Sequence, residues 1–373
     1  MKKNNTSSRR QFIYQLGMTG AGMHLLSAFG ASDALNEQRS RPKDGRLGIA
    51  LVGLGGYATG QLAPALQETG HCYLAGIVTG TPAKIPVWKE KYNIPDKNIY
   101  HYGNYEDIAK NPDIDIVYVV LPNNMHAEYT IRAFAAGKHV ICEKPMAITV
   151  EDCDKMIAAA KKANRQLSVG YRLHFDPFNK EMARLGTGNV YGKLKQVNGA
   201  FGFKATAGQW RLSKKYAGGG PLMDVGIYVV QGMCYTSGMK PLSVTAVEGP
   251  KTDPVRFAEV EQSLSWKFDF PGGLTGEGKS SYDDFYNVLT AVAEKGDFEL
   301  KPAFNYGGQK GVTPAGAMEF TPVNQQAKQM DAFALSVKNK TRSIVPGEMG
   351  RRDVQYLQAI YEAMRTGKKV MIR

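Results

Sequence analysis

The feature that most constrains the fold of this chain is the alternation of short apolar runs with helical patterns over residues 47–171. The apolar runs lie at 47–53, 73–79, 115–122 and 138–143. Runs of this kind are typical of strands that are covered on both sides, as they are in a parallel sheet. Because strands and helices alternate, we expect a doubly wound α/β sheet.

The segments between these runs have the residue pattern of helices. Thr149 is a suitable residue to begin one of them, with Asp152 in its first turn, and Gly137 is typical of the position just after a helix end. The expected helices lie at 57–69, 83–92, 104–110, 124–136 and 149–164, and a further strand follows at 166–171.

Residues 172–373 have a different pattern, in which most predicted strands follow one another without helices between them. A helix centred on 222–234 interrupts the series, and helices near 324–339 and 350–366 precede a final short strand. Consecutive strands favour a mainly antiparallel sheet. The predicted fold class is therefore α/β plus α+β: a doubly wound domain is followed along the chain by an open, mainly antiparallel β-sheet domain. The strand runs lie at 193–203, 242–249, 260–270, 274–282 and 285–294.

The composition argues against several other classes of protein. With 43% hydrophobic and 22% charged residues, the chain does not have the composition of a disordered protein. Its net charge of +13 comes from basic residues that are scattered, without the dense cluster expected of a nucleic-acid-binding protein. The 4 cysteines have neither C-x-x-C spacing nor His neighbours at ligand intervals, so we expect no metal site and interpret them as buried apolar residues.

Residues 1–31 resemble an export signal of the twin-arginine (Tat) type. Arg9 and Arg10 precede an uncharged, glycine-rich stretch at 12–31. An N-terminal membrane anchor is the alternative, but the glycines weaken the hydrophobicity that insertion requires. A polar arm or linker is expected at 32–46. The signal implies a periplasmic protein without stable membrane insertion after processing.

The turn after the first predicted strand reads GLGGYA at residues 53–58 and fits the pattern G-x-G-x-x-A. In such a turn Gly53 would allow the tight bend, Gly55 would let the backbone approach a pyrophosphate, and Ala58 would allow close helix packing. The pattern is weak by itself in a chain with 41 glycines, but its place between a strand and a helix indicates dinucleotide binding. The cofactor-binding residues predicted here are Gly53, Leu54, Gly55, Tyr57 and Ala58.

The end of the second predicted strand favours NADP over NAD. NAD sites usually place an Asp or Glu there for the ribose 2′-hydroxyl, but residues 74–87 contain no carboxylate. Thr79 and Thr81 offer hydroxyl groups and Lys84 offers a positive charge, a set that would attract a 2′-phosphate. The alternative is that these three residues only cap the following helix or are solvated.

Two further strings could place reactive side chains beside a bound cofactor. Lys144 lies in E-K-P directly after a predicted buried strand, and Pro145 stiffens its backbone. Next to a cationic nicotinamide, and partly desolvated, its amine would have a lowered pKa and could transfer or orient a proton. Asp224 and Tyr228 are four residues apart on a predicted helix and could together hold a sugar hydroxyl and pass its proton. The alternatives are an exposed lysine at a strand end, a buried tyrosine and a surface aspartate.

Taken together and in order, the motifs resemble those of the Gfo/Idh/MocA family of sugar oxidoreductases, in particular its glucose–fructose branch. The resemblance extends from about Leu47 to the C-terminus. It implies a Rossmann domain at 47–171 and a substrate-binding and oligomerisation β-sheet domain at 172–373. The motifs are G-x-G-x-x-A at 53–58, P-N-x-x-H at 122–126, E-K-P at 143–145, G-Y-R-x-H-x-D-P at 170–177 and G-G-G-x-L-M-D-x-G-I-Y at 218–228.

The resemblance also implies roles for individual residues. Lys144 would be the catalytic lysine, Tyr228 the acid/base group, and Asp224 a residue that holds the substrate or assists Tyr228. Tyr228 departs from the His of many family members but agrees with the glucose–fructose branch. That branch carries a long proline-rich arm, whereas the polar segment here is short, so retention of the cofactor is left open. The positions that line the cofactor cleft correspond to Pro122, Asn123, His126, Glu143, Lys144, Arg172, Trp210 and Arg211.

The implied activity is hydride transfer between two sugars. Outside the inner membrane no large pool of NADP would recycle the cofactor, so bound NADP would oxidise one aldose at C1 to a lactone and then reduce a second carbonyl sugar. A redox-neutral glycoside hydrolase that uses the same cofactor is one alternative, and a non-catalytic protein that binds a sugar or a nucleotide is another. The expected partners are small-molecule sugars, without nucleic acid, and further copies of the chain in a homodimer or homotetramer.

Overall fold

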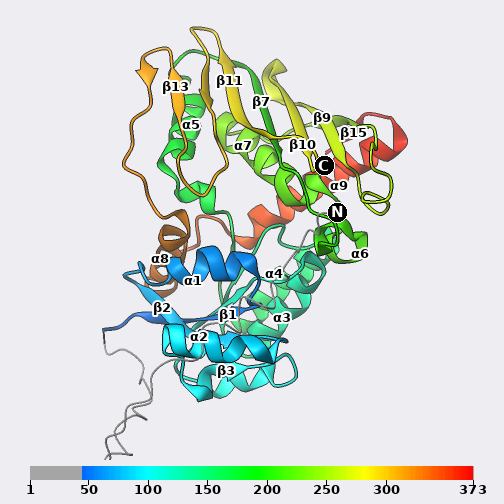
Figure 1. Cartoon of the computed structure of the whole chain (residues 1–373). Coiled ribbons are helices and arrows are strands. Elements are labelled where there is room, and N and C mark those ends of the chain that lie inside the picture. Colours follow the sequence, from blue (N-terminus) through cyan, green and yellow to red (C-terminus); the bar gives the residue numbers. More distant parts are fainter. Residues whose placement is uncertain (1–43, 373) are drawn as a thin grey trace, which may run out of the picture. The chain divides into compact units, whose positions relative to one another are not determined.

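The structure, a computed structural model, describes residues 44–372 (Figure 1). The predicted export signal at 1–31 and most of the predicted arm at 32–46 lie outside the described residues. Among the residues that are described, no helix is both long and apolar enough to cross a membrane.

Six parallel strands form the first sheet, in the order β3-β2-β1-β4-β5-β6. Alternate residues of β1 belong to two different core clusters, Ala50 and Val52 to one and Ile49 and Leu51 to the other. Both faces of the sheet are therefore covered, which confirms the predicted doubly wound α/β arrangement. The strands are β1 (Leu47–Val52), β2 (Cys72–Val78), β3 (Ile99–Tyr100), β4 (Ile116–Val119), β5 (His139–Cys142) and β6 (Leu167–Val169).

The helices between these strands begin and end close to the predicted positions. At the start of α4 (Val150–Ala163), the Thr149 hydroxyl accepts a hydrogen bond from the Asp152 N–H over 3.1 Å, as the sequence predicted. The short predicted helix is a 3-10 helix at Tyr105–Lys110, and the helix after the glycine-rich turn contains a π-helical stretch at Ala58–Leu62. The other helices of this region are α1 (Ala63–Ala65), α2 (Ile85–Tyr92) and α3 (His126–Ala135).

Within residues 172–372 a second sheet contains nine strands, in the order β14-β13-β12-β11-β7-β10-β9-β8-β15. Every neighbouring pair is antiparallel except β7 and β10, which are parallel. The prediction of a mainly antiparallel sheet is confirmed. The strands are β7 (Leu194–Gly202), β8 (Ser243–Glu248), β9 (Ser263–Asp269), β10 (Thr275–Ser281), β11 (Tyr286–Ala293), β12 (Phe298–Leu300), β13 (Gly311–Thr313), β14 (Gly316–Ala317) and β15 (Val370–Met371).

Helices cover one face of this sheet. A π-helical stretch at Leu222–Gly226 leads into α7 (Ile227–Ser237), which contacts β7, β10 and β11. Nearly all side chains of α7 are buried, because α5 and α9 pack around it. Residues of the opposite face, such as Thr245 and Lys267, are exposed. The remaining helices are α5 (Pro177–Thr187), α6 (Lys214–Ala217) and α9 (Gly347–Thr366).

Helix α8 (Gln325–Lys338) returns from the second sheet to the first domain. Its residues Ala327, Met330 and Phe333 share a core cluster with Ile49 and Leu51 of β1. The C-terminal part of the chain therefore contributes to the core of the first domain.

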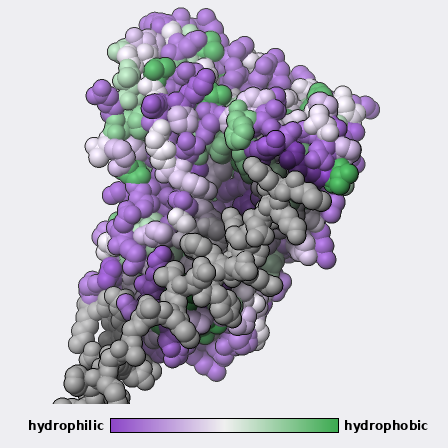
Figure 2. All heavy atoms as spheres, in the orientation of Figure 1, coloured by the Kyte–Doolittle hydropathy of each residue, from purple (hydrophilic) through white to green (hydrophobic). Residues whose placement is uncertain are grey.

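The distribution of polar and apolar residues is that of an ordinary globular protein. The face shown in Figure 2 is mainly hydrophilic, with hydrophobic residues scattered over it. Cys72, Cys142, Cys153 and Cys234 are free and buried, which confirms their interpretation as buried apolar residues. Within the described residues, no group of three or more His, Cys, Asp and Glu side chains could hold a metal ion.

Candidate functional site

The glycine-rich turn lies at the carboxyl end of β1 and leaves its backbone open. Gly53 has a φ of +95°, and a Cβ there would lie 2.4 Å from the Val120 carbonyl oxygen, so only glycine fits. A Cβ at Gly55 or Gly56 would meet nothing within 4 Å. Ala58 is fully buried, which allows the helix to pack closely. The turn presents accessible backbone at the start of a helix, an arrangement that suits a pyrophosphate.

The end of β2 lies beside this turn. Lys84 reaches across and donates a hydrogen bond from Nζ to the Leu54 carbonyl oxygen over 2.7 Å. Thr79 is buried and its hydroxyl accepts from the Thr81 N–H over 3.1 Å, so Thr79 stabilises the turn, in keeping with the alternative interpretation. Thr81 and Lys84 are exposed. A cation beside the turn, without a carboxylate, fits a phosphorylated ribose.

Lys144, Asp224 and Tyr228 come from different domains and meet at one point. Lys144 follows β5, and its Nζ donates to the Asp224 carbonyl oxygen over 2.6 Å and to Asp224 Oδ1 over 3.1 Å. The same Nζ lies 4.8 Å from the ring centroid of Tyr228. The side chains of Lys144 and Asp224 are only 13% and 14% exposed. The structure thus brings together the three residues that the sequence analysis assigned to the chemistry.

Asp224 is held as a carboxylate by two cations. Besides Lys144, it contacts Arg211, whose Nε lies 3.0 Å from Oδ2, and it accepts from the Tyr282 hydroxyl over 3.2 Å. Burial acts to raise the pKa of Asp224, but Lys144 and Arg211 lower it more, to about 2. Asp224 is therefore an anchor for the two cations rather than a proton donor. Arg211 also stacks on Trp210, with its guanidinium carbon 4.7 Å from the ring centroid.

The expectation of a lowered pKa for Lys144 is not met by the surrounding residues. Burial acts to lower the pKa of this amine, but Tyr228, Asp224 and Glu143 together raise it above its ordinary value. The protein's own groups therefore hold Lys144 as a cation. An ammonium in this place can stabilise negative charge on a neighbouring oxygen.

Arg172 lies on the other side of the Tyr228 ring, with its guanidinium carbon 5.0 Å from the ring centroid. The side chain is 2% exposed and donates hydrogen bonds to the Phe304 and Asn305 carbonyl oxygens and to Gln325 Oε1. The sequence analysis assigned Arg172 to the cofactor cleft. The structure shows that its guanidinium is engaged by the loop after β12 and by Gln325 of α8, and that it holds this loop against Tyr228.

Glu143 is a buried carboxylate next to Lys144. It accepts from the Tyr118 hydroxyl over 2.6 Å, and Tyr118 in turn accepts from Gln329 of α8 over 2.8 Å. Burial raises the pKa of Glu143. A Cβ at Gly170 would lie 2.4 Å from Glu143 Oε1, which explains the glycine in the G-Y-R string.

The residues of the P-N-x-x-H string form hydrogen bonds with neighbouring chain segments of the site. The His126 ring nitrogens lie 2.8 Å from the Pro145 carbonyl oxygen and 2.9 Å from that of Leu121, and burial lowers the pKa of His126 to about 4. Asn123 donates to the Ala217 carbonyl oxygen over 2.8 Å. The polar atoms of His126 and Asn123 thus connect chain segments, and Pro122, the first residue of the string, is half-buried beside them.

Sequence analysis missed two tyrosines of this site. Tyr282 follows β10 and donates to Asp224, and Tyr306 lies in the loop after β12 with its ring centroid 4.4 Å from the Arg172 guanidinium carbon. The chain has 19 tyrosines, and no spacing or motif distinguishes these two. Only the contacts made in the folded protein identify them.

Comparison with known proteins identifies the family. The model for the oxidoreductase family with an NAD-binding Rossmann fold matches residues 47–171, and the model for the GFO/IDH/MocA C-terminal domain matches residues 180–299. The chain therefore belongs to the Gfo/Idh/MocA family, as its motifs predicted. It is a sugar oxidoreductase with an NAD(P)-binding domain.

Within this family, the chain is similar over most of its length to several individual proteins. A solved structure of an aldose-aldose oxidoreductase from Caulobacter crescentus, complexed with glycerol, is 41% identical, with a TM-score of 0.85 over 87% of this chain and 99% of the other. A D-xylose 1-dehydrogenase [NADP(+)] from Haloarcula marismortui is 24% identical over 94% of this chain and 100% of its own length. A D-glucoside 3-dehydrogenase from Escherichia coli is 26% identical over 87% of this chain and 97% of its own length.

Proposed function

We propose that this enzyme oxidises one aldose at C1 to a lactone and passes the hydride, through NADP that stays bound, to the carbonyl carbon of a second sugar. The observation that carries the proposal is the meeting of Lys144, Asp224 and Tyr228 at the carboxyl edge of the first sheet. The likeness to an aldose-aldose oxidoreductase supports the choice of substrates.

The glycine-rich turn at residues 53–58 would hold the dinucleotide, and its nicotinamide, when bound, would supply the hydride acceptor for one sugar and the hydride donor for the other. Tyr228 removes the proton from the C1 hydroxyl of the donor as C1 loses its hydrogen, so that the C1–O bond becomes the lactone carbonyl. Lys144, with its ammonium at the Tyr228 ring, stabilises the Tyr228 phenolate that takes up this proton and is formed again when the proton is given back. In the second half-reaction Tyr228 returns this proton to the carbonyl oxygen of the acceptor, which becomes an alcohol. Asp224 holds Lys144 in place during both steps.

NADP, rather than NAD, is the proposed cofactor. Lys84 lies next to the glycine-rich turn, and Thr81 is exposed beside it. An amine at this place favours a 2′-phosphate, which an acidic residue would repel. The name of the Haloarcula relative includes NADP(+), in agreement with this choice.

The test is a spectrum of the purified protein before and after addition of sugars, without added cofactor. Addition of a donor aldose should produce the absorbance band of a reduced nicotinamide, and a second carbonyl sugar should then remove it. Lactone and alcohol should form in equal amounts. If no aldose produces the band although the protein carries a nicotinamide dinucleotide, the proposal is wrong.

A redox-neutral glycoside hydrolase is the second candidate. One relative is named D-glucoside 3-dehydrogenase, and oxidation of a glycoside is also the first step of such a hydrolase. Release of nitrophenol from aryl glycosides without lactone formation would favour this function. Lactone formation from a free aldose would favour the first.

We also propose that the protein is exported by the Tat pathway to the periplasm. The proposal rests on Arg9 and Arg10 before the uncharged stretch at 12–31. A protein with Arg9→Lys and Arg10→Lys should stay in the cytoplasm, whereas the wild type should appear in the periplasmic fraction. Equal export of both would contradict the proposal.

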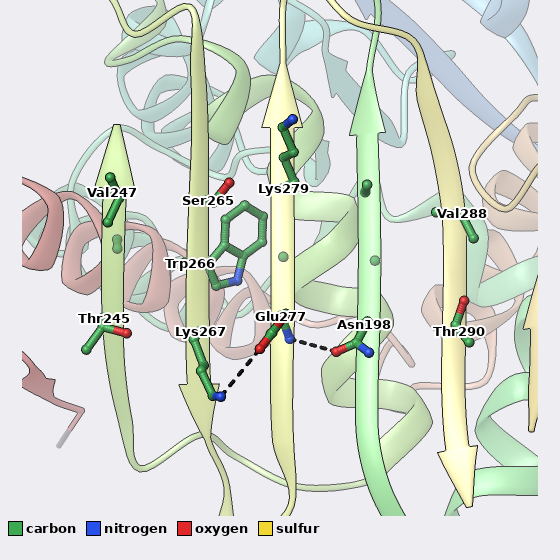
Figure 3. A pocket seen from close by; sticks show the side chains of 14 residues that line it. Asn198, Thr245, Val247, Ser265, Trp266, Lys267, Glu277, Lys279, Val288 and Thr290 are labelled. Atoms are coloured by element: carbon green, nitrogen blue, oxygen red, sulfur yellow. Dashed lines mark hydrogen bonds and ion pairs between the residues drawn. The ribbon is translucent and has the colours of Figure 1, made fainter. Parts of the chain in front are cut away.

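A homodimer or homotetramer is proposed as the assembled state. Support comes from the family resemblance and from the uncovered face of the second sheet, where a shallow groove crosses β8, β9, β10, β7 and β11 (Figure 3). Val247 on this face is 70% exposed, and Lys267 pairs with Glu277 over 3.4 Å. Val247→Glu should reduce the mass measured by light scattering if copies associate here. An unchanged mass would contradict association through this face.

A further inference from the structure

Five side chains form a continuous stack that runs from the glycine-rich turn to the catalytic lysine. The ring centroids of Tyr57 and Tyr306 lie 5.7 Å apart, and the Arg172 guanidinium carbon lies 4.4 Å from the Tyr306 ring. The same guanidinium carbon lies 5.0 Å from the Tyr228 ring, and Lys144 Nζ lies 4.8 Å from that ring. The mechanism uses Tyr228 and Lys144 but gives no role to the Tyr57–Tyr306 end of the stack.

The loop that carries Tyr306 is fixed at its base. Arg172 donates to the Phe304 carbonyl oxygen over 2.5 Å and to the Asn305 carbonyl oxygen over 2.7 Å. Asn287 of β11 accepts from the Phe304 N–H over 2.7 Å. All three hydrogen bonds hold residues that come just before Tyr306 in the loop. Arg172 and Asn287 therefore fix the position of the backbone from which the Tyr306 side chain reaches the first domain.

The tip of the same loop is exposed. It consists of residues 306–308, and Tyr306 itself is 49% exposed although one side of its ring rests on Arg172. A Cβ at Gly307 or Gly308 would meet nothing within 4 Å. A fixed base with two glycines after the aromatic residue is suited to a side chain that must swing aside and return.

We propose that Tyr306 closes the cofactor site against Tyr57 and thereby keeps NADP bound through both half-reactions. Tyr57 belongs to the turn that would bind the pyrophosphate, and Tyr306 comes from the loop after β12, so their contact links the two domains beside that turn. This inference rests on the proposed function, because only a cofactor that serves two successive sugars has to be retained. Closure by Tyr306 also accounts for retention of NADP in a chain whose predicted polar arm, at 32–46, is short.

The direct test is the rate at which NADP leaves the protein. Protein loaded with NADPH is mixed with excess NADP, and loss of the fluorescence of the bound NADPH is followed in time. We expect Tyr306→Ala to release the cofactor about 5- to 100-fold faster than wild type, which corresponds to loss of an aromatic pair and a cation–π contact. Tyr306→Phe keeps the ring and should release at the wild-type rate. Phe285 is an aromatic residue outside this stack and is 78% exposed, so Phe285→Ala should also release NADPH at the wild-type rate.

A double-mutant cycle with Tyr57→Ala separates the closing contact from a general loosening of the site. If the two rings act on each other, Tyr57→Ala combined with Tyr306→Ala should release NADP no faster than the faster single variant. Release that multiplies the two single effects would overturn the proposed contact. Unfolding curves of each variant, taken with NADP bound, verify that it is folded.

The outcomes distinguish this inference from the function on which it rests. If Tyr306→Ala retains NADPH as long as wild type does, Tyr306 does not close the site, and the two-sugar mechanism is unaffected. If the wild type itself loses its cofactor at every turnover and requires added NADP, the retained-cofactor function and this inference are both wrong.

Discussion

Asp224 allows the strongest quantitative prediction about the active site. Its carboxylate lies 3.1 Å from Lys144 Nζ and 3.0 Å from Arg211 Nε. Burial acts to raise its pKa, yet the two cations lower the pKa from 3.8 to about 2. A group with a depressed folded-state pKa stabilises the protein above the unfolded pKa, and this contribution is lost as the pH falls through the folded pKa. The lowered pKa corresponds to about 2 kcal/mol of unfolding free energy at neutral pH.

Asp224→Asn keeps the shape of the side chain and removes its charge. At neutral pH we expect the free energy of unfolding to fall by about 2 kcal/mol or more, because Lys144 and Arg211 lose their counter-ion. The difference between wild type and variant should shrink as the pH falls from 3.8 toward about 2, where the wild-type carboxylate becomes protonated.

Urea unfolding of both proteins across this pH range measures the effect, since other carboxylates contribute equally to the two. Asp96→Asn is the control, because the Asp96 side chain is 76% exposed and pairs with Lys89 at the surface. That pair should contribute little at any pH. A stability difference between wild type and Asp224→Asn that stays constant from neutral to acidic pH would refute the account of Asp224.

Three further predictions follow from the site. Tyr228→Phe should lower turnover about 100-fold or more while the protein still binds NADP, as measured by product formation and by cofactor fluorescence. Lys84→Gln should reduce the preference for NADP over NAD about fivefold in equilibrium titrations, and an unchanged preference would exclude a phosphate contact at Lys84. Gly170→Ala should destabilise the protein by about 1–3 kcal/mol in urea unfolding, because the new Cβ meets Glu143 Oε1. Gly60→Ala, where a Cβ meets nothing within 4 Å, should not destabilise it.

The parts of the fold that depend on local pattern could be predicted from the sequence. Five of the six parallel strands were predictable, because they are mostly apolar runs that are covered on both faces. Strand β3 (Ile99–Tyr100) was missed, because two residues are too few to form a pattern. Helix α5 was missed although a signal existed, since Asp176 accepts from the Asn179 N–H at its start and Pro177 occupies the first position. The π-helical stretch at Leu222–Gly226, which contacts β7 and β10, had no such signal in the sequence.

The electrostatics of the site could not be predicted, because they depend on residues that are distant in sequence. Lys144 was expected to have a lowered pKa, but Asp224, 80 residues further on, helps to raise it. Arg172 was assigned to the cofactor cleft, but its hydrogen bonds go to a loop about 130 residues away, at 304–305. Motifs identified which residues matter, and the tertiary contacts decide what each one does.

The central claim is that hydride passes from one sugar to another without leaving the enzyme. The most direct measurement uses an aldose that carries deuterium at C1, together with an unlabelled acceptor sugar and no added cofactor. The account predicts one deuterium on the newly formed carbinol carbon of the alcohol for each lactone produced. Alcohol without deuterium, or lactone formed only when external NADP is supplied, would contradict it.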